Sequence, residues 1–568
     1  MLPTKKWRFC LPGTDALREG LSALSFLERC IFWVLATILT LSTVGMLFSI
    51  RSLFLTSVPA SGGTLTEGIV GTPRFINPVI ARSDADRDLV ALVYSGLMRP
   101  TVEGLLIPDL AESYSISEDK TTYTFTVREN ARFHDGTPVT ADDVVFTVLT
   151  VQNPLIGSPL SRSWEGIEVQ AIDARTVTFK LPRPYAHFID NTTLGILPRH
   201  LWVEANEETF SIFAYNSEPI GSGPFAIEDI ERDPSGVPMV YTLRRFVDFA
   251  LGEPYLERIR MKMYDNEKDL LQAFIAGDVD AMPDVDPADA HELNDEESVV
   301  LSYPLPRVFA LFFNQNHNEL FADATVREAL TVAIDPQVVV DEVLYGYGAP
   351  LAGPLPPPLS HAPQETMHTI KAAQSILEAD DWIKGDDGVY ANDTQRLAFT
   401  ITTASTPELK HTAEVMVRVY ETLGADVELE VFDLGSLHQE VIRPRAYDAL
   451  LFGEVIGRSG DLFPFWHSSQ RNDPGLNAAL YTNIAVDDIL SDIRTTLDAE
   501  ERKKLYVSLE SEIGRDFPAV FLYAPHLVYA VSQRLKGVTE GPIDEGAERF
   551  MNVYEWHFGT RNVVTTLQ

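Results

Sequence analysis

Cysteine is almost absent from this chain of 568 residues, and its two copies, Cys10 and Cys30, lie within the first 30 positions. The remainder has no thiol, which excludes a disulfide framework, a cysteine zinc cluster and a cysteine nucleophile there. Basic residues are also few, since 45 Lys and Arg stand against 82 Asp and Glu, a formal net charge of −37. This acidity repels phosphate backbones, so we expect no nucleic-acid partner, and it favours the approach of cationic ligands.

The chain also lacks the usual signatures of catalysis and metal binding. It contains no GxSxG nucleophile elbow, no P-loop and no GxGxxG. His291-Glu292 lacks the second histidine of a zinc-protease helix, and the acidic run from Asp278 to Asp286 lacks the glycine and closing glutamate of an EF-hand loop. We therefore expect no catalytic residue, no metal site and no cofactor.

The composition is that of an ordered globular protein, with 45% hydrophobic and 22% charged residues. A chain of 568 residues exceeds what one hydrophobic core usually supports. We therefore predict two or three structural units, interleaved along the sequence rather than arranged in a row.

One long apolar run, from Cys30 to Ile50, has no charged residue and is long enough to span a bilayer as a helix. Basic residues gather before it, at Lys5, Lys6, Arg8, Arg18 and Arg29. The positive-inside rule then predicts a cytoplasmic segment 1–29, a transmembrane anchor 30–50, a linker 51–63 and an extracytoplasmic body. Two alternatives stay open: a signal peptide cleaved near Val58–Ser61, or a buried core helix.

Local patterns in the body predict alternating strands and helices. Tyr123, Phe125 and Val127 alternate with threonines and indicate a half-buried strand. Capping boxes predict two helices: Thr140 with Asp143, and Thr325 with Glu328. Asp335-Pro336 opens a further helix that ends near Gly346.

The second half of the body contains a compact strand, helix, strand unit. The run LAFTITT is followed by a helix that opens at Thr406-Pro407 and stops at Gly424, and then by VELEVF. This order predicts a parallel crossover. Asp498 and Glu501 cap a later helix, and PAVFLY and LVYAV indicate two strands near the end. The fold class is α/β with mixed sheets.

Ordered blocks along the body carry a resemblance to a known family. The stretch 109–148, DLAESYSISEDKTTYTFTVRENARFHDGTPVTADDVVFTV, resembles the signature of family 5 extracellular solute-binding proteins. These are the oligopeptide, dipeptide and nickel receptors of ABC importers. GTPRFINPV at 71–79, IGSGPF at 220–225, LLQAFIAGDVDAM at 270–282 and VREALTVAID at 326–335 are similar to family blocks in the same order. The resemblance covers the body from about residue 64.

The resemblance implies a two-lobe periplasmic-binding-protein-like fold with a hinge. Lobe I is expected at 64–308 plus 520–568, and lobe II at 309–519. It also implies a receptor, not an enzyme, that binds peptides between closing lobes as a monomer. Its partners are then an ABC permease, ATPase subunits and the membrane, reached through one N-terminal helix.

The resemblance also suggests where a ligand binds. In the segment LLFGEVIGRSGDLFPFWHSS, Asp461 matches the family aspartate that pairs with a peptide amine, and Glu454 stands where the family usually has an aromatic residue. The other candidates are Trp466, Phe465, Asn314, Thr72, Phe75 and Asn77. Structural roles stay open for all of these but Glu454: a turn cap for Asp461, core packing for Trp466 and Phe465, backbone hydrogen bonding for Asn314, and loop packing for Thr72, Phe75 and Asn77.

Other functions remain alternatives. A receptor for a sugar, an opine or a nickel chelate shares the same scaffold, so pocket residues rather than fold distinguish it. A surface-anchored hydrolase, or an adhesion or chaperone-like protein that kept the fold, belongs to a different class. Turnover of peptide or ester substrates would indicate the hydrolase.

Overall fold

The computed structural model describes residues 22–53, 55–293, 298–360 and 368–564. They form two compact units, one within Met1–Ala60 and Gly559–Gln568 and the other Ser61–Phe558. The first unit holds helix α2 (Phe26–Leu53) and strand β1 (Leu55–Pro59), which pairs antiparallel with β22 (Thr560–Val564). Residues 1–21 of the predicted cytoplasmic segment 1–29 lie outside the described residues.

Helix α2 confirms the predicted apolar helix and begins four residues before Cys30. Its Phe26–Met46 part is long and apolar enough to cross a membrane, and none of that window is buried inside the protein. Large apolar side chains such as Trp33 and Leu39 are 61% and 69% exposed. The alternative of a buried core helix is therefore wrong, and α2 has the properties of a membrane anchor or a signal sequence.

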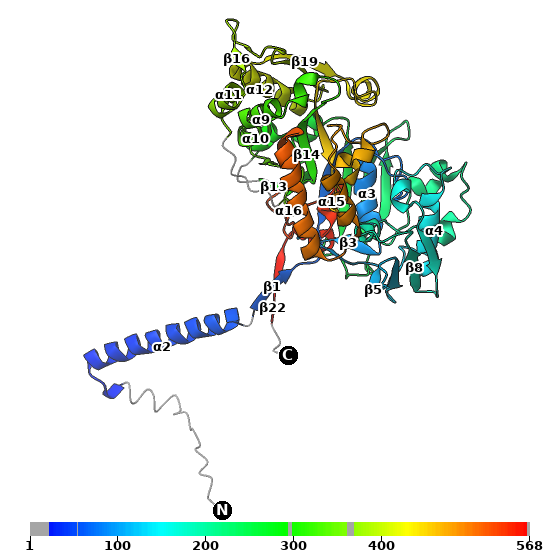
Figure 1. Cartoon of the computed structure of the whole chain (residues 1–568). Helices are drawn as coiled ribbons and strands as arrows, with labels where there is room; N and C mark the ends of the chain where they lie inside the picture. The colour runs from blue at the N-terminus through cyan, green and yellow to red at the C-terminus, as the bar shows by residue number, and fades with distance from the viewer. Residues whose placement is uncertain (1–21, 54, 294–297, 361–367, 565–568) are drawn as a thin grey trace, which may run out of the picture. The chain divides into compact units, whose positions relative to one another are not determined.

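A mixed sheet of 12 strands runs through the second unit (Figure 1). One end of its order is β19 (Asp426–Phe432), β18 (Ala398–Ala404), β20 (Ala449–Val455), β14 (Arg307–Phe313) and β21 (Ala519–Ser532). From β21 the order continues with β12 (Ala281–Met282), β2 (Thr64–Val70), β11 (Arg258–Tyr264), β10 (Pro238–Arg245) and β9 (Phe225–Arg232). β13 (Ser298–Pro304) and β15 (Gly348–Pro350) also pair with β21.

Strand β21 corrects one prediction. PAVFLY and LVYAV form one strand of 14 residues rather than two. Its first half pairs with β14 and its second half with β13. Pro525, between the two runs, has no N–H to donate, but its carbonyl accepts the Leu305 N–H at 3.1 Å and the strand continues.

Strands of the sheet contribute to two large hydrophobic cores, which we call the cores of lobe I and lobe II. A third, smaller core draws on residues from Leu270 to Ala290 with Val528 and Ala530. The lobe I core draws on residues from Leu65 to Leu305 and from Leu527 to Trp556. The lobe II core draws on residues from Val308 to Ala524. The chain thus passes between the cores at 305–308 and again at 524–527, and the two passages lie side by side as antiparallel strands.

Lobe I has a second sheet of four strands, in the order β5 (Ala111–Ile116), β6 (Thr122–Val127), β8 (Thr176–Lys180) and β7 (Glu168–Ala171). In β6, Tyr123, Phe125 and Val127 are buried and alternate with half-buried threonines, as predicted. The predicted box before α4 (Ala141–Gln152) is also present, because Asp143 accepts the Thr140 N–H at 2.8 Å.

In lobe II the strand, helix, strand unit is confirmed. β18 and β19 are parallel, and α12 (Pro407–Leu423) ends at Gly424, whose φ of +115° places it in the left-handed region. The box at Thr325 and Glu328 is wrong. Asp323 begins α9 (Ala324–Ala333) by accepting the Thr325 N–H at 2.9 Å, so the helix starts two residues earlier than predicted.

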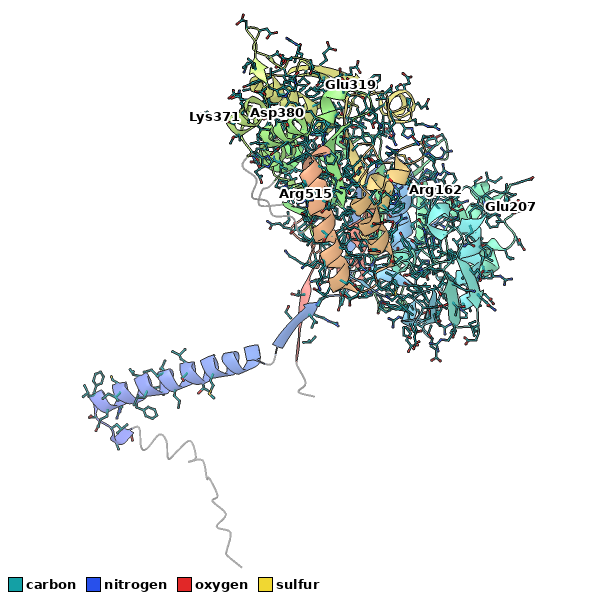
Figure 2. The ribbon with its side chains drawn as sticks, viewed as in Figure 1. Arg162, Glu207, Glu319, Lys371, Asp380 and Arg515 are labelled. Carbon is teal, nitrogen blue, oxygen red and sulfur yellow. The ribbon has the colours of Figure 1, made fainter. Side chains whose placement is uncertain are left out.

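The remaining longer helices flank the sheets. They are α3 (Asp84–Val93), α7 (Glu267–Ile275), α8 (Pro287–Glu292), α10 (Pro336–Leu344), α11 (Ile370–Ala379), α15 (Ile484–Thr495) and α16 (Ala499–Asp516). Asp335 and Asp498 cap α10 and α16, as predicted. Figure 2 shows charged side chains of these elements, such as Lys371 and Arg515, on the outer surface, where water solvates them.

A buried ion cluster joins the C-terminal part of lobe I to its first strand and helix. Arg549, in the 3₁₀ helix η7 (Gly546–Phe550), lies 3.0 Å from Glu67 of β2 and 2.6 Å from Asp88 of α3. The Tyr529 hydroxyl donates to Glu67 at 2.7 Å. The three charged side chains are at most 4% exposed. Two carboxylates thus share one guanidinium in the core.

Candidate functional site

Asp461 forms a side-chain contact between the lobes. Arg494, on α15, holds its carboxylate from one side, with Nη2 at 2.7 Å and Nε at 3.0 Å from Oδ2. From lobe I the Tyr185 hydroxyl donates to the same oxygen at 3.3 Å, and the Ala186 N–H donates to the Arg494 carbonyl at 2.8 Å. Asp461 therefore lies where lobe II meets lobe I, and its charge is already paired by Arg494.

Arg458 forms another side-chain contact between the lobes. It lies three residues before Asp461, in the loop after β20, and its guanidinium is 12% exposed. In lobe I it meets Glu548 at 2.6 Å and Asp544 at 3.7 Å. A cation of lobe II thus enters a group of carboxylates in lobe I.

A cavity of about 440 Å³ opens in lobe I beside this contact. Its wall comes from α3, from the loop 159–164, from the segment 190–195 and from η7 with the residues around it. Its size falls within the range of roughly 300–1,000 Å³ that ligand cavities occupy. Its charged lining residues are Arg87, Arg99, Asp109, Asp190, Glu545 and Glu548.

Two carboxyl groups of the cavity wall, Asp190 and Glu545, have raised pKa values. Burial raises the pKa of Asp190 to about 6, although Arg458 lowers it. Burial likewise raises the pKa of Glu545 to about 7, against the pull of Arg87, and Glu548 adds to the rise. The Glu545 side chain is nevertheless 49% exposed. Such a group has protein on most sides and water on one, as expected for the wall of a cavity.

Three of the predicted residues of lobe II, Trp466, Phe465 and Glu454, lie in or beside its core. Trp466 is 1% exposed and packs against Phe312 and Phe521 in the core, and Phe465 packs beside that core. Glu454 is 5% exposed, and neither of its carboxyl oxygens has a hydrogen-bond partner among the described residues. Burial raises its pKa well above 4.5. Burial therefore disfavours the ionised form of Glu454 in this arrangement.

Asn314, at the end of β14, organises a turn in lobe II. It is 1% exposed, donates to the Arg445 carbonyl at 2.9 Å and accepts the N–H groups of Asn316 and His317. These contacts correspond to the backbone role that the sequence left open for it.

In lobe I, Asn77 is fully buried, donates to Asn216 at 3.0 Å and accepts the Val79 N–H. Phe75 packs on the lobe I core and Thr72 is half-buried. None of the eight predicted residues lines the cavity.

The sequence did not reveal the residues that enclose the cavity and bridge the lobes. These are Tyr185, Asp190, Arg458, Glu545 and Glu548. A weak signal existed, because Arg458 lies in the same segment as Asp461, and IDEGAERF places three acids in eight positions. Positions as distant as 190 and 545 meet only in the fold.

Comparisons with known proteins agree with this architecture. The family model of bacterial extracellular solute-binding proteins, family 5, matches residues 106–474. The oligopeptide-binding protein AppA of Bacillus subtilis is 27% identical over 511 residues, covering 85% of this chain and 90% of AppA.

Two solved structures have the same fold. AppA of Bacillus subtilis in complex with a nonapeptide is 26% identical, with a TM-score of 0.66 over 88% of this chain and 100% of that one. NikZ of Campylobacter jejuni in complex with Ni(L-His) is 26% identical, with a TM-score of 0.68 over 87% and 99%. With more than half of its length matched by the family model, the chain belongs to the bacterial extracellular solute-binding proteins, family 5.

Proposed function

We propose that this protein is the extracytoplasmic receptor of an ABC importer, and that it binds peptides between lobe I and lobe II and delivers them to a membrane permease. The observation that carries the proposal is the lobe I cavity beside the contact of Arg458 with Glu548, next to the boundary of two cores that adjacent strands join. Two lobes joined by adjacent strands can close on a ligand, and this closure needs no covalent chemistry. The nonapeptide complex of AppA, a relative of matching length, supports peptides as the ligand class.

We place lobe I at 64–308 plus 520–568 and lobe II at 309–519. The first boundary is supported by the change of core between Leu305 and Val308. At the second boundary the lobe II core extends to Ala524, so β21 itself forms the joint.

Within the cleft, we propose Asp461 as the partner of a ligand amine. Its hydrogen bond from Tyr185, at 3.3 Å, is the longest of its side-chain contacts, so a ligand ammonium group can replace that hydroxyl. Arg494 keeps the carboxylate oriented throughout. Glu454, four residues before Arg458, is the second candidate ligand contact, through its unpartnered carboxyl group.

For localisation, we propose that α2 stays attached as a membrane anchor, with the N-terminus in the cytoplasm and the body outside. Support comes from β1, the strand that directly follows α2. Residues 55–59 pair with 560–564 in a continuous antiparallel register. Cleavage after Ala60, as a signal peptidase would perform, removes this strand and leaves β22 without its partner.

Retention of the anchor predicts an intact N-terminal segment in the native protein. Top-down mass spectrometry of the chain from its own membranes should give a mass that includes residues before 60. An Ala60→Leu variant is the control, because a large residue at the cleavage position blocks signal peptidase. If the wild-type protein begins at residue 61 while the variant keeps its N-terminus, the signal-peptide alternative is correct.

Peptide binding predicts that ligands stabilise the full chain in lipid nanodiscs. Pools of peptides of two to nine residues should raise the melting temperature by several degrees, since a ligand at 100 times its Kd stabilises by about 2.7 kcal/mol. Asp461→Asn should weaken binding at least tenfold by removing the anionic partner of the amine. Thermal unfolding followed by isothermal titration measures both effects.

The matched control is Asp473→Asn, because Asp473 forms a comparable two-point ion pair with Arg443 elsewhere in lobe II. This variant should bind peptides as the wild type does. Absence of any shift with every pool would contradict peptide binding, and hydrolysis of the pools, seen by mass spectrometry, would indicate the hydrolase instead.

A further inference from the structure

The charges on the cavity wall do not balance. Arg87 pairs with Glu545 at 3.0 Å, and Arg99 faces Asp109 at 3.8 Å. Arg458 enters from lobe II and pairs with Glu548. After these pairs Asp190 remains, and among the described residues no ion pair reaches its carboxylate.

Asp544 adds a further negative charge beside the cavity. It shares Arg458 with Glu548, and its contact with that guanidinium, at 3.7 Å, is the longer of the two. Burial raises its pKa to about 7, and Glu548 raises it further. One guanidinium therefore serves three neighbouring carboxylates, since Arg458 also lowers the pKa of Asp190.

Buried polar atoms in the same wall lack partners as well. Asp109 is 2% exposed, and its Oδ1 has no hydrogen-bond partner among the described residues. Tyr94 is 5% exposed, and its hydroxyl is likewise unpartnered. Both residues line the cavity. Unsatisfied buried polar groups are costly, so they mark places where a bound group supplies the missing hydrogen bonds.

We propose that this cavity receives a positively charged group of the ligand, an ammonium or guanidinium, with Asp190 as its principal partner and Glu545 beside it. The inference rests on the proposed function and specifies its substrate class as peptides that carry a basic side chain or an amine at one defined position. A ligand cation restores the charge balance that Arg458 alone leaves incomplete. Carboxylates at hydrogen-bond distance recognise such groups strongly because the bonds are charge-assisted.

The test compares arginine with citrulline, which has nearly the same shape and no charge. A set of short peptides carries one arginine, moved through each position, and each has a citrulline counterpart. Isothermal titration uses the full chain in lipid nanodiscs. At one position the arginine peptide should bind at least tenfold more tightly than its counterpart, and at the other positions the two should differ little.

Two variants assign this preference to the cavity. Asp190→Asn and Glu545→Gln should each reduce the preference for arginine at least fivefold and leave citrulline peptides unaffected. Glu228→Gln is the matched control, because Glu228 pairs with Arg258 outside the cavity at 2.6 Å, as Glu545 pairs with Arg87. Melting temperatures of all three variants show that each is folded.

The outcomes separate this inference from the proposed function. Equal binding of arginine and citrulline peptides at every position overturns the inference and leaves peptide binding intact. If no peptide binds, agmatine serves as a free guanidinium probe: binding of agmatine that Asp190→Asn abolishes supports the cation site and contradicts the peptide function. If neither peptides nor agmatine bind, both proposals are overturned.

Discussion

Arg549→Met should lower the free energy of unfolding of lobe I by roughly 3–5 kcal/mol, the usual cost of removing one partner from a buried ion pair. The substitution keeps an unbranched side chain of similar length but removes the charge. It leaves Glu67 and Asp88, which are 0% and 4% exposed, without their cation. Urea unfolding of the full chain in detergent, followed by tryptophan fluorescence, measures the change, because Trp556 lies in the lobe I core.

Arg258→Met provides the comparison. Arg258 also contacts two carboxylates, Glu228 and Glu257, but its side chain is 39% exposed. Loss of these exposed pairs should cost at most about 1 kcal/mol. Adding Glu67→Gln and Asp88→Asn to Arg549→Met should recover much of the lost stability, because no buried charge then remains. Equal effects of the two methionine variants would show that the buried cluster does not stabilise lobe I.

The local elements were predictable because their causes lie in a few neighbouring residues. The alternation at Tyr123, Phe125 and Val127 indicates that one face of the sheet is buried. Gly424 ends α12 because this position has a left-handed backbone conformation, which glycine adopts readily. The errors arose where two local signals compete. Asp323 and Thr325 are both good caps two residues apart, and only the contacts of the following helix decide between them.

The continuity of β21 was not predictable from local signals. Pro525 interrupts the apolar pattern and normally ends a central strand. Here β21 passes from the lobe II core to the lobe I core at Pro525. The Pro525 carbonyl accepts a hydrogen bond from the Leu305 N–H, so the strand continues although proline has no N–H to donate. The joint between the lobes thus lies at a residue that sequence rules assign to a loop.

In the site, too, the residue marked by its neighbours in sequence was predicted, and the partners that are distant in sequence were not. Asp461 was found through its own segment, and it lies at the contact between the lobes. Its partner Arg494, 33 residues later, was not found, because nothing in the local sequence marks that pairing. The cavity has walls from positions 87, 190 and 545, so no window of sequence contains it.

The pH dependence of stability should show the excess of buried carboxylates. Burial raises the pKa of Glu67 to about 7, although Arg549 and the Tyr529 hydroxyl lower it and Asp88 raises it further. A carboxyl whose pKa is raised on folding contributes stability that is complete below its unfolded pKa, near 4.5, and that is lost as the pH rises through about 7. Asp190, Asp544 and Glu545 have raised pKa values for the same main reason, burial, and act in the same direction.

We therefore expect the free energy of unfolding of the ligand-free protein to fall between pH 5 and pH 8. Glu67 alone should account for roughly 2–3 kcal/mol of this fall, because a pKa shift of one unit corresponds to about 1.4 kcal/mol. Glu67→Gln should flatten this dependence and should be at least as stable as the wild type at pH 8, since the amide oxygen still accepts from Arg549 and one negative charge leaves the core. Urea unfolding midpoints at pH 5, 6, 7 and 8 measure the slope. An unchanged slope in Glu67→Gln would mean that Glu67 stays ionised throughout, with Arg549 fully compensating both carboxylates.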